Sequence, residues 1–566
     1  MTRMFSTGYA AIEPIKGLKL KETLSYDYTI QKDSRYYNPL SSAGPKSGSD
    51  AQTAKGFIEY GKLISSTSLN YVRTFARKHH LDVLAAYEIE SYQTDHASGE
   101  KSKLPSDKLT EPDNAAVLNS FKSATQAYRM ISYLSRLNYD YDDRYYIAGS
   151  YRRDGSSRLS PNNRWGNFWS VSGMWHLGNE NFMKAVKPVL SDVKIRASYG
   201  VNGNQPGSYY GYKGLYSYGE NYMEAAGSYE SAQPNDLLTW EKNYSLNLGI
   251  DLSFINRIFA SLEYYNRDTK DLLYSLPISA TTGFTSYLSN IGRLNNKGVE
   301  FELRTLNVVS NDFNWTSVFN LSHNRNKIVS LNGLLDQTIE GTWFIHKVGL
   351  PYHTFYVKEF AGVDPLTGSA QYYLNTKNED GSYNRELTTD AAKAESIPYK
   401  TATPKVSGGF TNILNYKWID LTFTLTYSLG GYSFDKLGTY IENCSSSIYS
   451  SRYNLPAYMM NRWQKPGDQT DIPRFVYGEP ATSTNSSRYI HSTDHLRLKN
   501  FTLGFTLPNQ WTQKLMIDKV RVYFSGNNLL TWAKWKQYDP ETPVNGEVFC
   551  EAPAMRTFSF GAQLSF

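Results

Sequence analysis

The sequence predicts an all-β fold of one kind, a transmembrane antiparallel β-barrel, and three patterns support this prediction. Runs of alternating polarity recur along the chain, and many have the nine to eleven residues with which a tilted strand crosses a bilayer. Short turns alternate with long polar loops. The chain also ends on a strand with one apolar face. Together these patterns indicate strands that face lipid on one side and water on the other.

The alternation is clearest in residues 244–254 and 419–429. In each run the large apolar side chains share one face, and Ser, Thr, Asn, Asp and Gly take the other. Helical periodicity is confined to short pieces such as residues 180–189. Similar alternating faces, longer than the typical soluble strand of about five or six residues, lie at 18–30, 193–201, 299–307 and 501–507.

The connections between these runs fall into two classes. Outer-membrane barrels place short turns on the periplasmic side and long loops outside, and this rhythm predicts about seventeen spanning strands. The parity of that count leads us to expect that residues 1–566 form a barrel domain that is incomplete at its N-terminus, and residues 1–16 show no signal peptide. Short turns are expected near 14–17, 77–79, 142–143, 255–257, 310–311 and 416–417, and long loops at 31–56, 94–122, 202–237, 271–290, 323–404 and 430–494.

Composition narrows the class further. No stretch approaches eighteen consecutive apolar residues, so a helical membrane protein is excluded. The 59 basic and 53 acidic residues form no basic block, and nucleic acid is not an expected partner. Aromatic residues make up 15% of the chain, and the 46 Tyr suit membrane interfaces and sugar-binding surfaces. Cys444 and Cys550 lack CxxC spacing and indicate neither a metal site nor redox chemistry; the sequence leaves their state open.

The last strand carries an alternation that ends on an aromatic residue. Phe558, Phe560, Ala562, Leu564 and Phe566 share its apolar face. Such a strand at the end of a soluble chain would invite aggregation, whereas in a barrel it pairs with the first strand. The terminal Phe566 resembles the recognition signal of outer-membrane assembly machinery.

Several segments resemble the SusC/RagA group of TonB-dependent transporters, in an order that covers nearly the whole chain. The resemblance implies a barrel of about 22 strands, a plug domain in its lumen, and energy from the TonB system through an N-terminal part absent here. It also implies a SusD-like lipoprotein as an extracellular lid, and oligosaccharides or peptides as substrates. The segments are 13–20 (EPIKGLKL), 153–158 (RDGSSR), 163–166 (NRWG), 194–200 (KIRASYG), 202–204 (NGN), 290–302 (NIGRLNNKGVEFE), 496–508 (LRLKNFTLGFTLP), 521–531 (RVYFSGNNLLT) and 538–541 (YDPE).

No enzyme motif is present: the sequence has no HExxH, GxSxG, phosphate loop or GxGxxG. Glu300 and Glu302 lie two residues apart and point to the same lumenal side, where paired carboxylates could exchange protons. Arg304 lies on that face too, and a solvated ionic wall is the favoured interpretation. The chain is therefore not expected to be an enzyme.

Two small clusters contain residue types that can bind metal ions. Asp140, Asp142 and Asp143 could supply carboxylate oxygens, but a short periplasmic turn explains them better. His79 and His80 cannot both face one side of a strand, so a metal site there would need ligands from elsewhere. We expect neither a metal nor a cofactor.

The best place to look for substrate binding is a loop with six tyrosines. Flat aromatic faces can stack on sugar rings, and the hydroxyls can hydrogen-bond them. The favoured alternative is packing between loops or contact with the lid protein, because such loops must pack on something. The tyrosines are Tyr209, Tyr210, Tyr212, Tyr216, Tyr218 and Tyr222.

Two further classes of protein remain as alternatives. A soluble extracellular β protein that binds polysaccharide would bury its apolar strand faces. An outer-membrane barrel enzyme would need a nucleophile and a base, and none is discernible. Strand length and loop asymmetry favour an integral outer-membrane transporter in contact with lipid, and which substrate it takes is not readable from the sequence.

Overall fold

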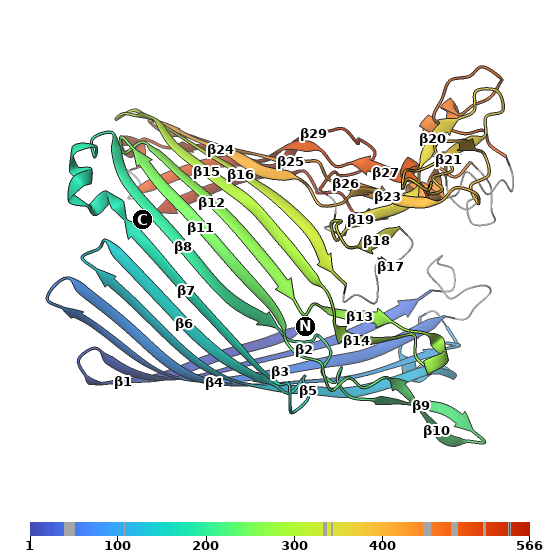
Figure 1. Cartoon of the computed structure of the whole chain (residues 1–566), viewed down its shortest axis with the longest axis horizontal. Coiled ribbons are helices and arrows are strands. Elements are labelled where there is room, and N and C mark those ends of the chain that lie inside the picture. Colours follow the sequence, from blue (N-terminus) through green and yellow to red (C-terminus); the bar gives the residue numbers. More distant parts are fainter. Residues whose placement is uncertain are drawn as a thin grey trace. The chain divides into compact units, whose positions relative to one another are not determined.

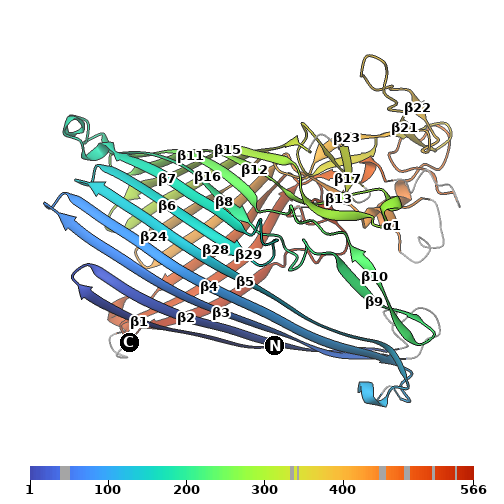
Figure 2. The same cartoon turned by 60° about the horizontal axis from the view of Figure 1, so that its bottom comes forward.

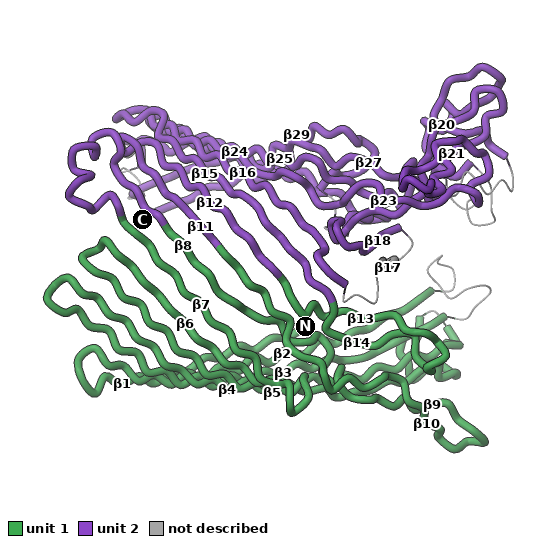
Figure 3. Tube along the Cα trace, viewed as in Figure 1, with its two compact units in different colours: residues 1–176, 196–246, 269–291 green, residues 177–195, 247–268, 292–566 purple. Residues whose placement is uncertain are grey.

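The computed structural model is nearly all-β, and seventeen of its strands belong to one sheet, which confirms the predicted fold class and strand count. The structure describes residues 1–38, 51–106, 108–331, 337–340, 343–444, 454–476, 485–512, 517–541, 543 and 545–565. Its contacts divide the chain into two compact units (Figure 3). Unit 1 comprises residues 1–176, 196–246 and 269–291, and unit 2 comprises residues 177–195, 247–268 and 292–566.

Unit 1 is built on an antiparallel meander in which each strand pairs with the next (Figure 1). Tight turns join the strands at one end, and Ala76, Arg77, Asp142 and Asp143 adopt positive φ there. The short turns predicted near 14–17, 77–79 and 142–143 are thus confirmed. The strands are β1 (Thr2–Ile15), β2 (Leu18–Tyr37), β3 (Gln52–Phe75), β4 (His79–Ser102), β5 (Val117–Tyr141), β6 (Tyr145–Ser156) and β7 (Trp165–His176).

The connections at the other end of unit 1 are shorter or more ordered than predicted. The expected loop at 94–122 is wrong in its bounds, because β4 continues to Ser102 and β5 begins at Val117. The polar residues of this segment suggest a loop, but they belong to the strands. β4 and β5 have 24 and 25 residues and continue into water, where both faces of a strand can be polar. The loop at 202–237 folds into the hairpin β9 (Leu215–Tyr222) and β10 (Ala225–Ala232), and 271–290 into β13 (Leu273–Pro277) and β14 (Ser286–Asn290). Figure 2 shows both hairpins away from the tight-turn end.

Unit 2 contains a second antiparallel series in which each strand pairs with the one before it. The predicted strand at 419–429 is β25, and the predicted run at 244–254 lies in β11 (Glu241–Phe254). Residues of β8 (Leu190–Asn204), β11 and β12 (Ile258–Lys270) belong to both units. The series comprises β15 (Arg293–Val309), β16 (Phe313–Ser330), β24 (Val406–Tyr416), β25 (Ile419–Leu429), β28 (His495–Thr506), β29 (Lys519–Ala533) and β31 (Thr557–Ser565).

The register of unit 2 aligns apolar side chains into a row across six strands. Directly opposed residues share a face of the sheet, so all the side chains of this row point to the same side. Leu530, the last residue of the row, is 49% exposed. The neighbouring polar row contains Thr411 and Thr424, whose hydroxyls are 3.0 Å apart. The apolar row consists of Leu303, Phe319, Phe410, Leu425, Leu498 and Leu530.

Many large apolar side chains on the strands of unit 1 are likewise exposed rather than packed in a core. A soluble β domain buries such faces, and the exposed arrangement is instead what contact with hydrocarbon requires. Among the described residues, no helix is long and apolar enough to cross a bilayer. Exposed examples are Leu63, Leu69, Ile89, Leu137, Ile147 and Val171.

The long connections of unit 2 are structured as well. Residues 323–404 and 430–494 are predicted to be loops, yet they contain short strands and a small core. The two-residue alternation in the sequence does not reveal these strands, because each is only a few residues long. The core is formed by Phe355, Val357, Ala402, Phe434, Tyr489 and Ile490. The short strands are β17 (Gln337–Glu340), β18 (Phe344–Lys347), β19 (Thr354–Lys358), β20 (Phe360–Val363), β21 (Ala370–Tyr373), β22 (Leu387–Thr388), β23 (Ser396–Thr401), β26 (Tyr432–Asp435) and β27 (Ile490–Ser492). A later short strand, β30 (Glu547–Val548), pairs with β26.

Helices are few and short. The helical periodicity predicted at 180–189 corresponds to the 3₁₀ helix η3 (Asn181–Ala185). The other described helices are η1 (Pro112–Asn114), η2 (Leu177–Asn179), η4 (Ala280–Thr282), α1 (Gly438–Ile441), η6 (Ala457–Asn461), η8 (Ser487–Tyr489) and α2 (Asn509–Thr512).

The two rows of unit 2 predict a sided response to charge. Leu425→Arg should lower the free energy of unfolding by about 2–4 kcal/mol, because a cation near the middle of the hydrocarbon is costly. Thr424→Arg, one residue away on the polar face, should cost less than about 1 kcal/mol. Denaturant titration of each variant in lipid vesicles measures both values, and equal losses would contradict the assignment of faces.

A buried carboxyl in the small core of unit 2 predicts a pH dependence. Burial raises the pKa of Asp435 to about 6, although its carboxylate accepts a hydrogen bond from the Gly438 N–H. The folded state therefore keeps the proton between about pH 4 and 6 while the unfolded state loses it, and stability falls as the pH rises through that window. Asp435→Asn should remove a loss of about 1–3 kcal/mol. Hydrogen exchange of the β26 amides, corrected for intrinsic rates, should depend on pH in the parent chain and not in Asp435→Asn. If the variant shows the same pH dependence as the parent chain, Asp435 is not its cause.

Candidate functional site

The six tyrosines singled out in the sequence do not form one surface. Tyr209, Tyr210 and Tyr212 pack into unit 1, whereas Tyr216 and Tyr218 lie exposed on the β9–β10 hairpin together with Tyr222. The two halves of the loop therefore have different surroundings.

The first half is held by a stack of aromatic rings around an arginine. Tyr92 of β4 and Tyr128 of β5 have ring centroids 5.3 Å apart, and Tyr209 lies 6.2 Å from Tyr92 and 5.9 Å from Tyr128. The Arg158 guanidinium carbon lies 4.1 Å from the Tyr128 ring centre and 4.6 Å from that of Tyr209. A planar cation between two rings is a favourable arrangement, so this stack holds the loop to the strands.

Next to the stack, a buried carboxylate is paired with a partly exposed lysine. The Tyr128 hydroxyl donates to Glu90, which is 7% exposed. The Lys62 ammonium nitrogen lies 3.0 Å from the other Glu90 oxygen. Paired in this way, a carboxylate can be buried at a tolerable cost, and it fixes the orientation of the Tyr128 ring.

The segment 153–158 (RDGSSR) explains how the loop is attached. Ser156 Oγ donates to Gln205 Oε1 at 2.6 Å, and Arg158 Nη1 donates to the carbonyls of Pro206 and Gly207 at 3.0 and 3.3 Å. Asp154, which is 7% exposed, accepts from Arg152 Nε at 2.7 Å. The sequence identified this segment only as part of a family resemblance; the structure shows that it ties the loop after β8 to the end of β6.

The other two packed tyrosines are also accounted for. Tyr210 Oη accepts a hydrogen bond from the Ala127 N–H at 3.2 Å, and Tyr212 packs on the core formed by Leu159, Phe168, Leu238 and Trp240. The motif at 163–166 borders this core, since a Cβ on Gly166 would lie 2.4 Å from the Phe168 ring. For these tyrosines the favoured alternative of loop packing describes what the structure shows.

The second half of the loop is exposed. Tyr216, Tyr218 and Tyr222 are 59%, 76% and 75% exposed, and all three lie on β9. Tyr216 and Tyr218 share one face of the hairpin and oppose Glu230 and Ser228. Adjacent hydroxyl-bearing rings beside a carboxylate provide both flat apolar faces and hydrogen-bonding groups.

The candidate carboxylates of β15 lie on a polar wall. Glu300, Glu302 and Arg304 are all exposed, as the ionic-wall interpretation requires. Glu302 borders a polar cavity of about 260 Å³ in unit 2 that also includes Asp192 and Lys194, whose charged atoms lie 3.6 Å apart. The wall carries both signs of charge.

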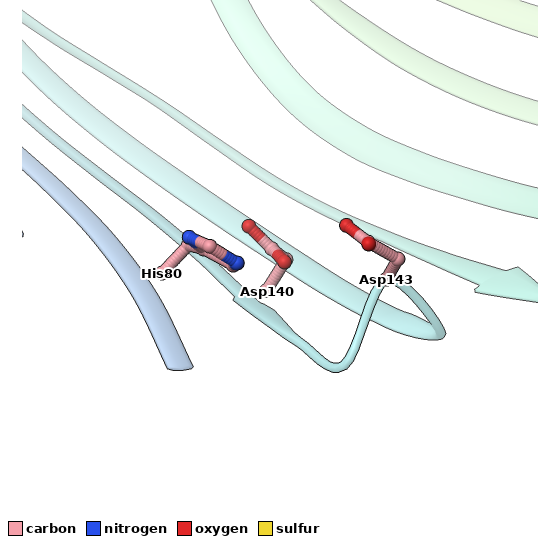
Figure 4. A group of neighbouring side chains, drawn as sticks. All are labelled: His80, Asp140 and Asp143. Carbon is pink, nitrogen blue, oxygen red and sulfur yellow. The ribbon is translucent and has the colours of Figure 1, made fainter. Parts of the chain in front are cut away.

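The candidate metal ligands are divided in an unexpected way. Asp142 and Asp143 form the tight turn between β5 and β6, as predicted, and Asp142 pairs with Lys78 and Arg144. Asp140 and Asp143 instead lie beside His80 of β4 (Figure 4). Phe566, the proposed assembly signal, lies outside the described residues.

Two segments that the sequence flagged only by resemblance meet in unit 2. Buried Arg497, from 496–508, pairs through Nη2 with Asp539 and through Nη1 with Glu541 at 3.1 Å, both from the 538–541 segment. Burial alone would raise the pKa of Asp539, but the N–H groups of Glu541 and Ala554 and the Arg497 side chain hold it below its ordinary value. Arg497 and Asp539 border a cavity of about 890 Å³, within the range of small-ligand sites, whose lining includes Trp532, Trp535, Tyr538 and Arg556.

Long paired strands with exposed apolar faces and ordered loops at one end of unit 1 define an outer-membrane β-barrel protein. Residues 2–529 match the family model described as TonB dependent receptor-like, beta-barrel. The chain belongs to this family of outer-membrane receptors and transporters.

Individual relatives confirm the resemblance to the SusC/RagA group. TonB-dependent receptor P3 of Formosa agariphila is 30% identical over 99% of the chain and 57% of that relative. TonB-dependent receptor SusC of Bacteroides thetaiotaomicron is 31% identical over 83% of the chain and 47% of its own length. The solved structure of the RagAB peptide transporter superposes with a TM-score of 0.88 at 28% identity, covering 100% of this chain and 62% of the other. The chain thus spans about half to two thirds of the proteins it resembles.

The arginine between two rings yields a direct test. Arg158→Lys keeps the charge but loses the planar stack and one or more carbonyl contacts, so the segment 205–210 should open more easily by about 1–3 kcal/mol. Arg153→Lys is the matched control, because Arg153 lies over a single ring, that of Trp165, at 5.0 Å. Hydrogen exchange of the 205–210 amides measures the change, and an equal effect of both substitutions would contradict the proposed attachment.

Proposed function

We propose that residues 1–566 form the barrel domain of a receptor that takes oligosaccharides or peptides across the cell outer membrane. Energy would come from the TonB system through a part of the receptor outside this sequence, and a SusD-like lipoprotein would cover the extracellular side. Family membership and the likeness to SusC and to the RagAB peptide transporter support this proposal. The observation that carries its substrate-binding part is the exposed tyrosine face of the β9–β10 hairpin.

The chemistry of that face suits both substrate classes. A pyranose ring presents a flat face of C–H groups that packs on a phenol ring, and its hydroxyls can bond the Tyr216 or Tyr218 hydroxyl and the Glu230 carboxylate. A peptide in extended form offers side chains for the rings and a backbone for the same polar groups. The rings have few internal degrees of freedom, so little entropy is lost when they bind.

The hairpin is connected to the rest of unit 1 on both sides. After β10, Asn235 is held by two hydrogen bonds. Its backbone N–H donates to the Tyr212 carbonyl at 3.0 Å, and its side-chain Nδ2 donates to the Leu288 carbonyl at 2.8 Å. On the other side, the Arg158 stack fixes Tyr209 and Tyr210 a few residues before β9. The exposed rings are therefore presented from an anchored base.

The tyrosine face predicts a selective loss of binding. Replacing Tyr216 and Tyr218 together by Ala should weaken substrate binding about tenfold or more, since each buried aromatic contact contributes on the order of 1 kcal/mol. Tyr229→Ala is the control, because Tyr229 is 50% exposed on the same hairpin but opposes Ser217, on the other face. Titration of the purified full-length receptor with an oligosaccharide panel and a peptide panel measures the change and identifies the class.

Contact with the lid lipoprotein is the competing role for the same rings. Co-purification of the lipoprotein with the double variant separates the two. Normal co-purification with weakened substrate binding supports the proposal, whereas lost co-purification with unchanged substrate affinity would assign the rings to the lid.

A further inference from the structure

We infer that His80, Asp140 and Asp143 form a binding site for a divalent transition-metal cation of the Zn²⁺ type. One ligand atom from each side chain lies within 4.8 Å of the others (Figure 4). The site is in unit 1 at the tight-turn end of β4, β5 and β6. It goes beyond the proposed uptake function, because it lies on the tight turns and not on the loops.

Strand register brings the three ligands together. His80 of β4 directly opposes Asp140 of β5, so the two side chains share a face of the sheet. Asp143 follows in the β5–β6 turn with φ of +53°, which returns its carboxylate toward the same face. His79 points the other way, with its ring 4.9 Å from that of Tyr141. The neighbouring strand thus supplies the outside ligands that the histidine pair alone lacks.

The histidine is held in a suitable orientation. Its Nδ1 lies 2.8 Å from Thr74 Oγ1, and a ring nitrogen fixed by a neighbouring hydrogen bond is the usual arrangement behind a metal-ligating imidazole. With Nδ1–H donating to the threonine oxygen, Nε2 is the unprotonated nitrogen that can bind a cation.

The carboxylates are also suitably placed. Asp140 Oδ1 is shielded from solvent and, among the described residues, receives no hydrogen bond. The nearby cations Lys78 and Arg144 have their charged nitrogens 3.7 and 3.3 Å from Asp142, and Asp143 Oδ1 accepts a hydrogen bond from the Tyr146 hydroxyl at 3.5 Å. A dication would supply the partner that Asp140 Oδ1 lacks.

The ligand set selects the kind of cation. One imidazole nitrogen and two carboxylate oxygens suit Zn²⁺, which accepts three protein ligands and a water, whereas Ca²⁺ and Mg²⁺ prefer oxygen alone. Ligands at about 2.0–2.2 Å from Zn²⁺ lie roughly 3.4 Å apart. Side-chain rotations that move the ligand atoms by about an ångström would therefore bring them to the separation that Zn²⁺ requires. The bound ion would cross-link β4 to β5 and to the turn that follows β5.

The test is a titration of the purified chain in detergent micelles with ZnCl₂, in a Cys550→Ser background that removes the exposed thiol. We expect one saturable site that CaCl₂ and MgCl₂ do not fill. His80→Gln and the isosteric Asp140→Asn should each weaken it more than about 100-fold, and Thr74→Val about 10- to 100-fold. His79→Gln and Asp142→Asn, the adjacent residues that face elsewhere or pair with cations, should bind as the parent chain does.

Protein integrity is checked separately from binding. Each variant should show the same strand content by circular dichroism and unfold at the same denaturant concentration without metal. Zn²⁺ should raise the unfolding midpoint of the parent chain and of His79→Gln and Asp142→Asn, but not that of His80→Gln or Asp140→Asn. The inference is overturned if the parent chain shows no saturable Zn²⁺ binding, or if folded His80→Gln and Asp140→Asn bind Zn²⁺ as tightly as His79→Gln.

Discussion

The structure depends on one constraint: in hydrocarbon, every backbone N–H and C=O must find its partner within the protein. Paired antiparallel strands meet this demand, and the two-residue period then decides what each side of the sheet contacts. The row from Leu303 to Leu530 and the neighbouring row with Thr411 and Thr424 are the two results of that period in unit 2. At the tight-turn end, short turns allow each strand to pair with the next one directly after the chain reverses.

Where the strands leave the hydrocarbon, a different kind of interaction holds the chain. Arg158 between Tyr128 and Tyr209, and Arg497 with Asp539, both use a planar cation to fasten a loop to a strand. Guanidinium groups suit this role because they stack on rings and donate several hydrogen bonds from one plane. The recognition groups that we propose lie next to a loop held in this way, and ordering it in advance would reduce the entropy lost on binding.

The sequence revealed the parts of the molecule that a two-residue period determines. The run at 419–429 is a strand with those bounds, and the turns at 142–143 and 255–257 have positive φ where predicted. Pairing between distant residues was not readable, because periodicity contains no information on register across loops. The sequence could not show that Tyr209 packs on β4 and β5 while Tyr218 stays exposed, nor that His80 opposes Asp140. The motifs known only by resemblance, 153–158 and 538–541, prove to be the points of attachment.

Strands β4 and β5 have 24 and 25 residues, about twice what a bilayer crossing needs. At about 3.4 Å per residue, the excess gives a stiff ribbon that continues for some 40 Å along its own direction beyond the hydrocarbon. Backbone hydrogen bonds brace that ribbon against bending, so it can act as a stalk. Side chains near its tip therefore stand well clear of the hydrocarbon on a support that resists bending.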